Sequence, residues 1–277
     1  MKYFLLILML SLGLNAADAP GWFREATTSA LPEYPAKTPA AVLLQEETVT
    51  IEPNGKQTRT TRYAVKILNR DGIREARFAD LYFSDTGKPK DFKAWLISPS
   101  GTTKEYSKSD IQDQSFAGGL YDEYRGRVLD ARQAADPGSF LGVESTIEQN
   151  HVFSQFQYDF QDDLPAVRSS FVLNLPSGWS AKGRVFYGSE VRPLEPQISG
   201  NSYRWQLTKL DPWEREPWSP RRPITRPRLA VDLIPISDLP TKLERFSSWK
   251  NVSAWKEQLT ERSAVVTPEI TTYVEQV

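Results

Sequence analysis

Hydrophobic and polar residues alternate along most of the chain between positions 42 and 235. In the stretch 57–68, Tyr63, Val65 and Ile67 fall on one side of an extended backbone, opposite more polar neighbours. A period of two predicts a β-strand with one buried face. Similar stretches occur at 42–52, 73–83, 92–97, 144–160, 167–175, 181–187, 203–210 and 228–234. We expect residues 144–160 to form one bent strand or a hairpin.

Short turn sequences separate these stretches. Pro53-Asn54-Gly55 is one example, in which Pro presets φ and Asn-Gly accepts positive φ. Strands joined by such turns, without helical patterns between them, predict antiparallel sheets packed face to face rather than βαβ units. We therefore assign the mainly β class and a β-sandwich domain over residues 42–235.

Two regions do not follow the alternating pattern. Residues 18–41 are rich in Pro, Ala and Thr, and we interpret them as an extended lead-in without helix or strand. Residues 108–137 are polar and irregular, and we interpret them as a long loop or excursion between sheets.

The C-terminal region, residues 236–277, has a helical pattern instead. Val252, Trp255 and Leu259 recur at steps of three and four, which predicts an amphipathic helix that Ser248 or Asn251 caps. Thr267 and Pro268 predict the start of a second helix. That helical pattern reaches Val277 after about two turns, so we expect a longer parent protein that continues past it.

The N-terminus has the layout of a secretory signal peptide. Lys2 precedes a continuous apolar run over residues 3–14, and small residues follow it. The run is shorter than the roughly 20 residues that a spanning helix needs, although an uncleaved membrane anchor is the alternative. We predict a signal peptide over residues 1–17, cleavage after Ala16 or Ala17, and export to the periplasm or the extracellular space without later membrane attachment.

Composition restricts the chemistry. The chain has no Cys and one His, His151, so disulfides, thiolate catalysis and a two-His metal site are excluded. The net charge of −1 provides no basic surface for nucleic acid. No phosphate loop, dinucleotide fingerprint or nucleophile elbow is present. We therefore expect no catalytic residue, no metal and no cofactor.

Several segments, in this order, resemble a known family. They are Arg62-Tyr63-Ala64-Val65-Lys66-Ile67-Leu68-Asn69, the turn at Gly72, Ser98-Pro99-Ser100-Gly101, Asp136-Pro137-Gly138-Ser139, Glu216-Pro217-Trp218-Ser219-Pro220 and Ser248-Trp249-Lys250-Asn251-Val252-Ser253-Ala254-Trp255. The chain from Val42 onward resembles domain of unknown function 3857, which precedes transglutaminase-like cores in exported bacterial proteins.

The resemblance implies an immunoglobulin-like β-sandwich followed by the first helices of a truncated transglutaminase-like domain at residues 236–277. It also implies a Cys-His-Asp catalytic triad in a core beyond Val277. No residue of this chain matches that nucleophile, so no catalytic residue is carried over. The expected partner is a transglutaminase-like domain in the same polypeptide.

Aromatic residues provide a candidate binding surface. Trp205, Trp213 and Trp218, with Tyr203, fit a platform for a sugar ring or a peptide. The alternative is packing, in which Trp205 lies in the core while Trp213 and Trp218 hold a Pro-rich exit segment against the sandwich. We retain Trp213, Trp218 and Tyr203 as binding candidates.

Other polar groups admit both functional and structural interpretations. His151 fits a general base or a ligand, or a structural or surface residue within a strand. Asp159, Asp162 and Asp163 fit a paired-carboxylate or Ca²⁺ site, or turn chemistry. The basic run comprises Arg215, Arg221, Arg222, Arg226 and Arg228, and we interpret it as a solvated face because acids and prolines interrupt it.

Three functions remain open at this point. The first is a non-catalytic module that scaffolds or positions substrate for a neighbouring transglutaminase-like domain. The second is a periplasmic carbohydrate- or peptide-binding module that uses Trp213 and Trp218. The third is an enzyme that uses Asp162, Asp163 or His151.

Overall fold

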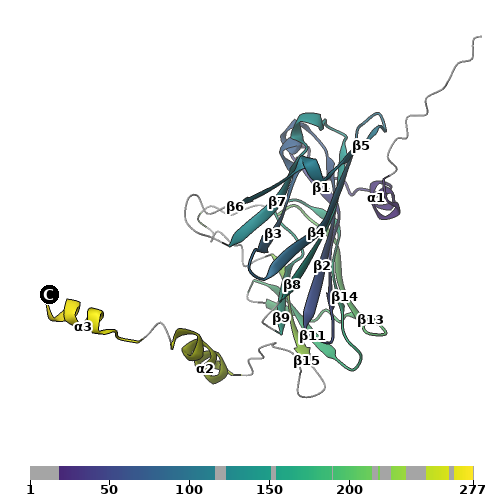
Figure 1. The fold of residues 1–277 in the computed structure, drawn as a ribbon. Helices are drawn as coiled ribbons and strands as arrows, with labels where there is room; N and C mark the ends of the chain where they lie inside the picture. The colour runs from purple at the N-terminus through teal and green to yellow at the C-terminus, as the bar shows by residue number, and fades with distance from the viewer. Residues whose placement is uncertain are drawn as a thin grey trace, which may run out of the picture.

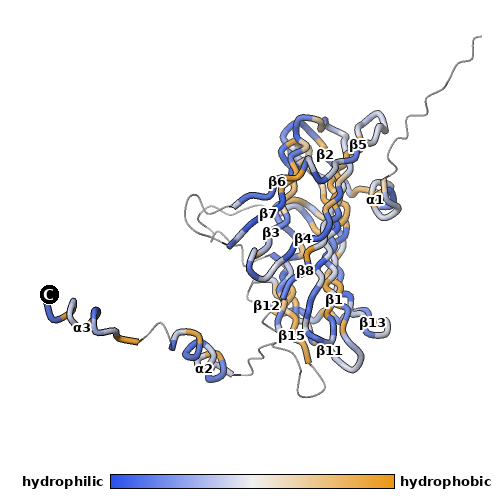
Figure 2. The backbone as a smooth tube through the Cα atoms, in the orientation of Figure 1, coloured by the Kyte–Doolittle hydropathy of each residue, from blue (hydrophilic) through white to orange (hydrophobic). Residues whose placement is uncertain are grey.

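The computed structural model describes residues 19–115, 123–150, 154–188, 190–213, 218, 226–234, 248–261 and 265–276. Within these residues the strands form three sheets, of eight, four and three strands (Figure 1). The mainly β class is therefore confirmed. Along the strands, hydrophobic and hydrophilic positions alternate, as Figure 2 shows, which is the pattern of sheets with one buried face.

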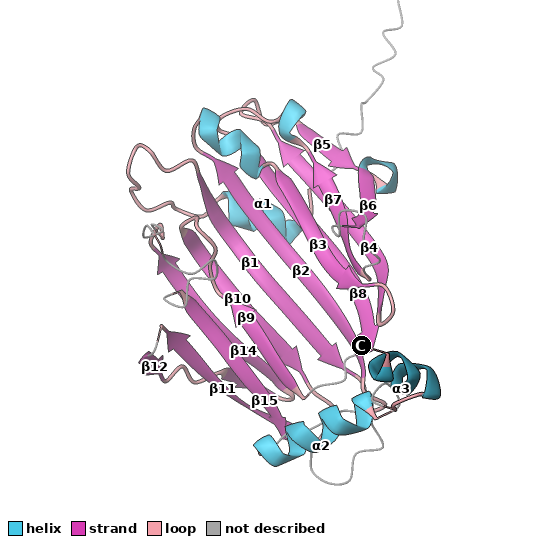
Figure 3. Ribbon diagram, turned by 90° about the vertical axis from the view of Figure 1, so that its left-hand side faces the viewer, coloured by secondary structure: helices cyan, strands magenta, loops and turns pink. Residues whose placement is uncertain are grey.

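The eight-stranded sheet forms the broad layer seen in Figure 3. In spatial order its strands are β13 (Gln197–Ser199), β14 (Ser202–Leu210), β10 (Ala166–Asn174), β1 (Ala40–Ile51), β2 (Lys56–Ile67), β8 (Phe140–Asn150), β4 (Gly87–Ile97) and β5 (Thr103–Tyr106). The hairpin between β1 and β2 uses the predicted turn, in which Gly55 has φ 85° and Asn54 Oδ1 accepts from the Lys56 amide at 2.9 Å.

Two smaller sheets cover the inner face of this layer. The four-stranded sheet contains β12 (Glu190–Arg192), β11 (Ser180–Tyr187), β15 (Pro227–Ile234) and β9 (Gln155–Asp159), in that order. The three-stranded sheet contains β3 (Arg77–Phe83), β7 (Tyr124–Asp130) and β6 (Ile111–Ser115). Short 3-10 helices lie at Arg70–Glu75 (η1), Lys108–Asp110 (η2) and Arg132–Ala134 (η3).

One strand pair departs from the antiparallel pattern. β1 pairs with β10 in parallel, with Val42 opposite Ala166 and Thr50 opposite Asn174. The cause is the route of the chain between β8 and β10. After β8 the chain enters the four-stranded sheet as β9 and then returns to the large sheet beside β1. A parallel pair needs such a crossover, which local alternation does not encode.

The smaller sheets each enclose an apolar core. Under the four-stranded sheet lie Phe171 and Trp205 with aliphatic residues of β1, β11 and β15. The indole of Trp205 occupies the space that a side chain at residue 183 would need, since a Cβ on Gly183 would approach Trp205 Nε1 to 2.7 Å. Under the three-stranded sheet lies a second core, which includes Val65, Leu129 and residues of β4 and β8.

A polar row runs along the inner face of β2 between these two cores. It consists of Tyr63, Thr61, Arg59 and Gln57, which follow the apolar pair Ile67 and Val65 on the same side of the strand. On the adjacent strand β1, Glu47 lies opposite Thr61. A central strand of a large sheet normally carries apolar residues on its covered face, so this row marks a place where packing alone does not explain the sequence.

The expectation of a wholly extended lead-in is wrong, because α1 (Gly21–Thr27) forms within it. Phe23 and Ala26 of this helix are buried against the outer face of the large sheet, beside Leu44 and Trp95. The ring of Phe23 lies directly over Gly142, where an added Cβ would come within 2.6 Å of the ring. Burial of Phe23 stabilises a helix that is too short to form alone.

Two further expectations need correction. Residues 108–137 are not one long loop, because β6 and β7 form the three-stranded sheet with β3. Residues 144–160 are neither one bent strand nor a hairpin, because β8 belongs to the large sheet and β9 to the four-stranded sheet. In both cases the strand partners are far apart in sequence, and local periodicity does not identify distant partners.

The two predicted C-terminal helices are present. α2 (Trp249–Thr260) is capped by Ser248, whose hydroxyl accepts from the Asn251 amide, and α3 (Pro268–Glu275) is capped by Thr267. Neither helix has a buried residue, and Figure 1 shows both apart from the sheets. Among the described residues, none of the helices has the length and apolar character needed to cross a membrane. The predicted signal peptide lies outside the described residues.

Candidate functional site

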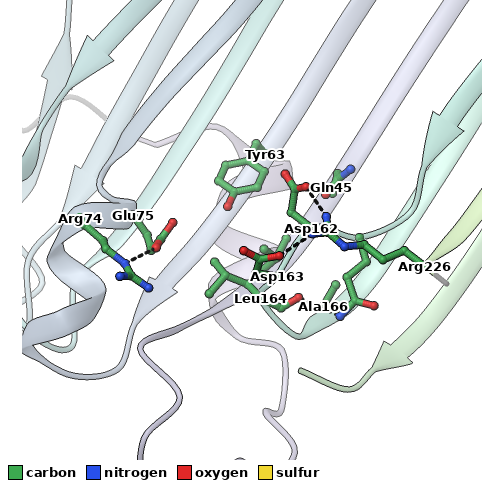
Figure 4. Close-up of a pocket in the computed structure, with 11 residues that line it drawn as sticks. Gln45, Tyr63, Arg74, Glu75, Asp162, Asp163, Leu164, Ala166 and Arg226 are labelled. Atoms are coloured by element: carbon green, nitrogen blue, oxygen red, sulfur yellow. Dashed lines mark hydrogen bonds and ion pairs between the residues drawn. The ribbon is translucent and has the colours of Figure 1, made fainter. Parts of the chain in front are cut away.

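A pocket of about 340 Å³ lies at the Tyr63 end of the polar row. Its walls come from β1, β2, η1, the connection between β9 and β10, and the residue before β15. Figure 4 shows the Tyr63 ring between two charged groups, the Arg74–Glu75 pair and the group formed by Asp162, Asp163 and Arg226. Positively and negatively charged side chains therefore line the same pocket.

Arg226 is the central residue of the second group. Its Nη1 lies 2.7 Å from Asp162 Oδ1, and its Nη2 lies 2.5 Å from Asp163 Oδ1. The guanidinium also lies over the Trp213 ring, 4.6 Å from the centroid. The side chain of Arg226 is 14% exposed, whereas those of Asp162 and Asp163 are 95% and 73% exposed. The arginine is thus enclosed, and the two carboxylates cover it from the solvent side.

This arrangement connects three backbone segments. The Trp213 amide donates to the Asp163 carbonyl at 3.2 Å, which joins the end of β14 to the β9–β10 connection. Gln161 Nε2 donates to the carbonyls of Leu164 and Asp211, which joins the same two segments again. Arg226 directly precedes β15, so its ion pairs with Asp162 and Asp163 connect the start of β15 to these two segments. We call Arg226, Trp213, Asp162 and Asp163 the arginine clamp.

Tyr63 separates the clamp from η1. Its ring packs on Phe78 with centroids 5.4 Å apart. Burial raises the pKa of the Tyr63 hydroxyl, and the nearby carboxylates of Glu75 and Asp162 raise it further. On the other side of the pocket Arg74 Nε lies 2.9 Å from Glu75 Oε1. Tyr63 is therefore a protonated hydroxyl at neutral pH, able to donate or accept a hydrogen bond but not to act as a phenolate.

The aromatic candidates do not form one surface. Tyr203 lies in the apolar core, where it stacks on Trp205 at 6.0 Å with an interplanar angle of 18°. Trp213 is half-buried under Arg226. Trp218 is fully exposed and has a positive φ of 67°. Trp205 is fully buried, as the packing interpretation expects.

The structure brings together only part of the polar candidates. Asp162 and Asp163 meet Arg226, while Asp159 contributes its backbone carbonyl to Gln45 Nε2 at 3.0 Å. His151, Arg215, Arg221 and Arg222 lie outside the described residues. Within the described part of the chain, no group of three or more His, Asp or Glu residues is placed to hold a metal ion.

Arg226 is not the solvated residue that the basic run suggested. Trp213, the Asp162-Asp163 pair and Arg226 are each candidates in the sequence. More than 60 residues separate Arg226 from the carboxylates that bind it, so the sequence does not show that they meet. The strand predicted at residues 228–234 is present as β15, which follows Arg226 and lies between β11 and β9 in the four-stranded sheet. Most of the segment between Trp213 and Arg226 lies outside the described residues.

Sequence comparison places this architecture in a family. Residues 53–214 match the family model described as Domain of Unknown Function with solved-structure structure (DUF3857). The chain belongs to the DUF3857 family. The match spans β2 to β14, yet β1 and β15 are interior strands of their sheets, so the folded unit of this DUF3857 protein extends beyond the matched residues on both sides. Comparison with curated protein sequences gives no match.

Comparison with solved structures gives matches at low sequence identity. A candidate protease from Parabacteroides distasonis superposes with a TM-score of 0.58 at 14% identity, covering 70% of this chain and 40% of that protein. Yeast LTA4 hydrolase gives a TM-score of 0.38 at 11% identity, covering 77% and 33%. An M1 zinc metallopeptidase from Deinococcus radiodurans gives 0.31 at 10% identity, covering 69% and 41%. The first likeness supports the fold, and this DUF3857 chain spans less than half of that protein.

Proposed function

We propose that this DUF3857 protein is a non-catalytic β-sandwich module of an exported protein. Its role is to scaffold or position substrate for a transglutaminase-like domain in the same polypeptide. The observation that carries the proposal is the arginine clamp. The carboxylates that a hydrolytic site would need, Asp162 and Asp163, are both held by Arg226, and together they join three backbone segments.

The contacts of these groups support a structural role. Asp162 and Asp163 each lie against one terminal nitrogen of the Arg226 guanidinium. Tyr63 has its pKa raised by burial, so its hydroxyl stays protonated. Arg74 and Glu75 form their own ion pair. The charged groups around the pocket thus form ion pairs with one another. These contacts hold the ends of the strands in place.

The C-terminal helices support a neighbouring domain. α2 and α3 expose large apolar side chains, among them Trp249, Leu259, Ile270 and Tyr273. An amphipathic helix gains most of its stability when its apolar face is covered. Since residues 248–255 resemble the first helix of a transglutaminase-like domain, that domain is the proposed cover for these faces. Residues 1–17 resemble a signal peptide, which supports export of the whole protein.

The reading frame downstream of Val277 tests this proposal directly. We expect it to continue into a domain with a Cys-His-Asp triad, and expression of the longer protein to bury Trp249 and Tyr273. Protection of these residues from oxidative footprinting reports that burial. A stop codon directly after Val277 contradicts the role in a transglutaminase-like protein.

A second function is favoured by one observation. The Trp218 side chain is fully exposed on a backbone with positive φ, which costs free energy for a residue other than Gly. Such a ring suits contact with a glycan or a peptide. Tyr203 is in the core and Arg226 covers Trp213, so a binding surface here rests on Trp218 with Trp213 as a supporting residue.

A further inference from the structure

A second pocket, of about 300 Å³, lies near the Gln57 end of the polar row. It opens where the three-stranded sheet separates from the large sheet, between the β3–β4 turn, the start of β7 and the end of β8. Its lining includes Arg59, Phe83, Thr86, Tyr124, Gln149 and Asn150. This set combines aromatic rings with amide, hydroxyl and guanidinium groups.

Two neighbouring rings form the apolar side of this pocket. Phe83 and Tyr124 are directly paired between β3 and β7, with ring centroids 5.3 Å apart at 51°. Phe83 is 56% exposed, whereas most large apolar residues of these sheets are buried. An exposed aromatic ring in a pocket offers a flat face whose partial negative charge attracts C–H groups.

The charge in this pocket is already compensated. Arg59 Nη2 lies 2.7 Å from Asp80 Oδ1 and donates to the Leu81 carbonyl at 2.8 Å, while Nη1 lies 3.7 Å from Glu47 Oε2. An anionic ligand would compete with two carboxylates for one guanidinium. The amides of Gln149 and Asn150 offer neutral donors and acceptors instead, so the lining suits an uncharged polar ligand.

A buried amide next to this pocket lacks a partner. Gln57 is fully buried, and neither its Nε2 nor its Oε1 has a hydrogen-bond partner in the structure. It is paired across the strands with Gln149, which lines the pocket, and directly paired residues have Cβ atoms about 5 Å apart. Asp80 is 3% exposed, and its Oδ2 is also without a partner. Buried polar groups are normally satisfied. Gln57 and Asp80 do not line the pocket, so they form a polar layer behind its wall rather than part of its surface.

We propose that this pocket binds one ring of a neutral saccharide. The C–H face of the sugar packs on Phe83, and its hydroxyl groups exchange hydrogen bonds with Gln149 and Asn150. Hydroxyl groups suit both amide donors and amide acceptors. The proposed scaffolding role assigns no ligand to this pocket, and the pocket is lined by other residues than the surface around Trp218.

Saturation-transfer difference NMR of the complete chain tests this site with chitotetraose, cellotetraose and maltotetraose as probes. We expect signals from at least one of them. Replacement of Phe83 by Leu keeps apolar bulk but removes the ring, so the dissociation constant should rise roughly tenfold. Phe83→Tyr keeps the ring and should bind as the wild type does. Because Phe83 is exposed, neither variant should unfold the protein.

Gln149→Met provides an independent arm of the same test. It removes an amide that lines the pocket without changing the shape greatly, so affinity should fall while the melting temperature stays close to that of the wild type. The proposal is overturned if no tetrasaccharide gives a signal, or if binding is unchanged in both Phe83→Leu and Gln149→Met. It is also overturned if binding is lost in Trp218→Ala alone, which would place the saccharide on the other surface.

Discussion

Arg59 Nη2 on the central strand β2 lies 2.7 Å from Asp80 Oδ1 on β3, and both side chains are largely buried. This contact joins the eight-stranded sheet to the three-stranded sheet across their interface. Glu47 on β1 lies on the other side of the same guanidinium. A buried ion pair costs desolvation on both partners, so removal of Asp80 leaves the Arg59 guanidinium with only the longer contact of 3.7 Å to Glu47.

Replacement of Asp80 by Ala should therefore destabilise the protein by about 3–5 kcal/mol in urea denaturation. The matched control is the triple variant Glu47→Gln, Arg59→Met, Asp80→Leu, which removes all charges of the cluster together. Its free energy of unfolding should be much closer to that of the wild type. Equal losses in the two proteins would show that the contact between Arg59 and Asp80 is not the cause.

The same cluster predicts a dependence of stability on pH. Burial raises the pKa of the Glu47 carboxyl and outweighs the opposing effect of Arg59, and Asp80 raises it further. Since the folded protein then binds this proton more tightly than the unfolded chain, the stabilisation is complete below the ordinary glutamate pKa. It is lost as the pH rises through the raised value.

Glu47→Gln should remove this loss, because glutamine carries no titrating proton. The free energy of unfolding of the variant minus that of the wild type should therefore increase as the pH rises from about 4 to about 7.5. Urea denaturation at several pH values measures it. If the difference in stability between variant and wild type does not change with pH, or falls as the pH rises, the buried environment assigned to Glu47 is wrong.

Phe23 and Gly142 should show strong coupling in a double-mutant cycle. Phe23→Ala empties a buried site and should cost about 3–5 kcal/mol. Gly142→Ala places a methyl group against the Phe23 ring and should cost about 1–3 kcal/mol. In the double variant the methyl group enters the emptied space, so the total should be smaller than the sum. Additive losses would mean that α1 does not pack on Gly142.

The arginine clamp should depend more on packing than on its exposed charges. Arg226→Ala removes both the ion pairs and the contact with Trp213, and should cost about 1–2 kcal/mol. Asp162→Asn should cost less than about 1 kcal/mol, because this carboxylate is almost wholly exposed. Thermal unfolding followed by tryptophan fluorescence measures both. An equal loss in the two variants would leave no role for the Trp213 contact.

Trp218 separates the two proposed functions. Its side chain is fully exposed, so Trp218→Ala should leave the melting temperature unchanged. Under the scaffolding role, retention on insoluble cell-wall glycan should also remain the same in this variant. A loss of retention at unchanged stability would favour the glycan- or peptide-binding function, with Trp213→Ala as the variant that should lose stability instead.

Features set by neighbouring residues could be predicted from the sequence. The alternation at Tyr63, Val65 and Ile67 predicts the strand β2, and the turn at Gly55 predicts its hairpin, because both depend on local backbone preferences. The cap at Ser248 follows for the same reason.

Features set by distant contacts could not be predicted in this way. α1 exists because Phe23 is buried against the large sheet, and β10 lies beside β1 only after a crossover through another sheet. The clamp around Arg226 and the contact between Arg59 and Asp80 likewise join residues that the sequence separates. The aromatic residues of the sequence include Trp213 as a candidate, but the sequence does not show that Arg226 packs on its ring.

The scaffolding role is tested most directly by turnover. Purified protein and its Asp163→Asn variant are incubated with amide, ester and glycoside substrates, and product formation is measured. We expect neither protein to turn over any of them, since Asp163 serves to hold Arg226 in the clamp. Turnover at an enzyme-like rate by the wild type, lost in Asp163→Asn while the fold is retained, would contradict a non-catalytic module.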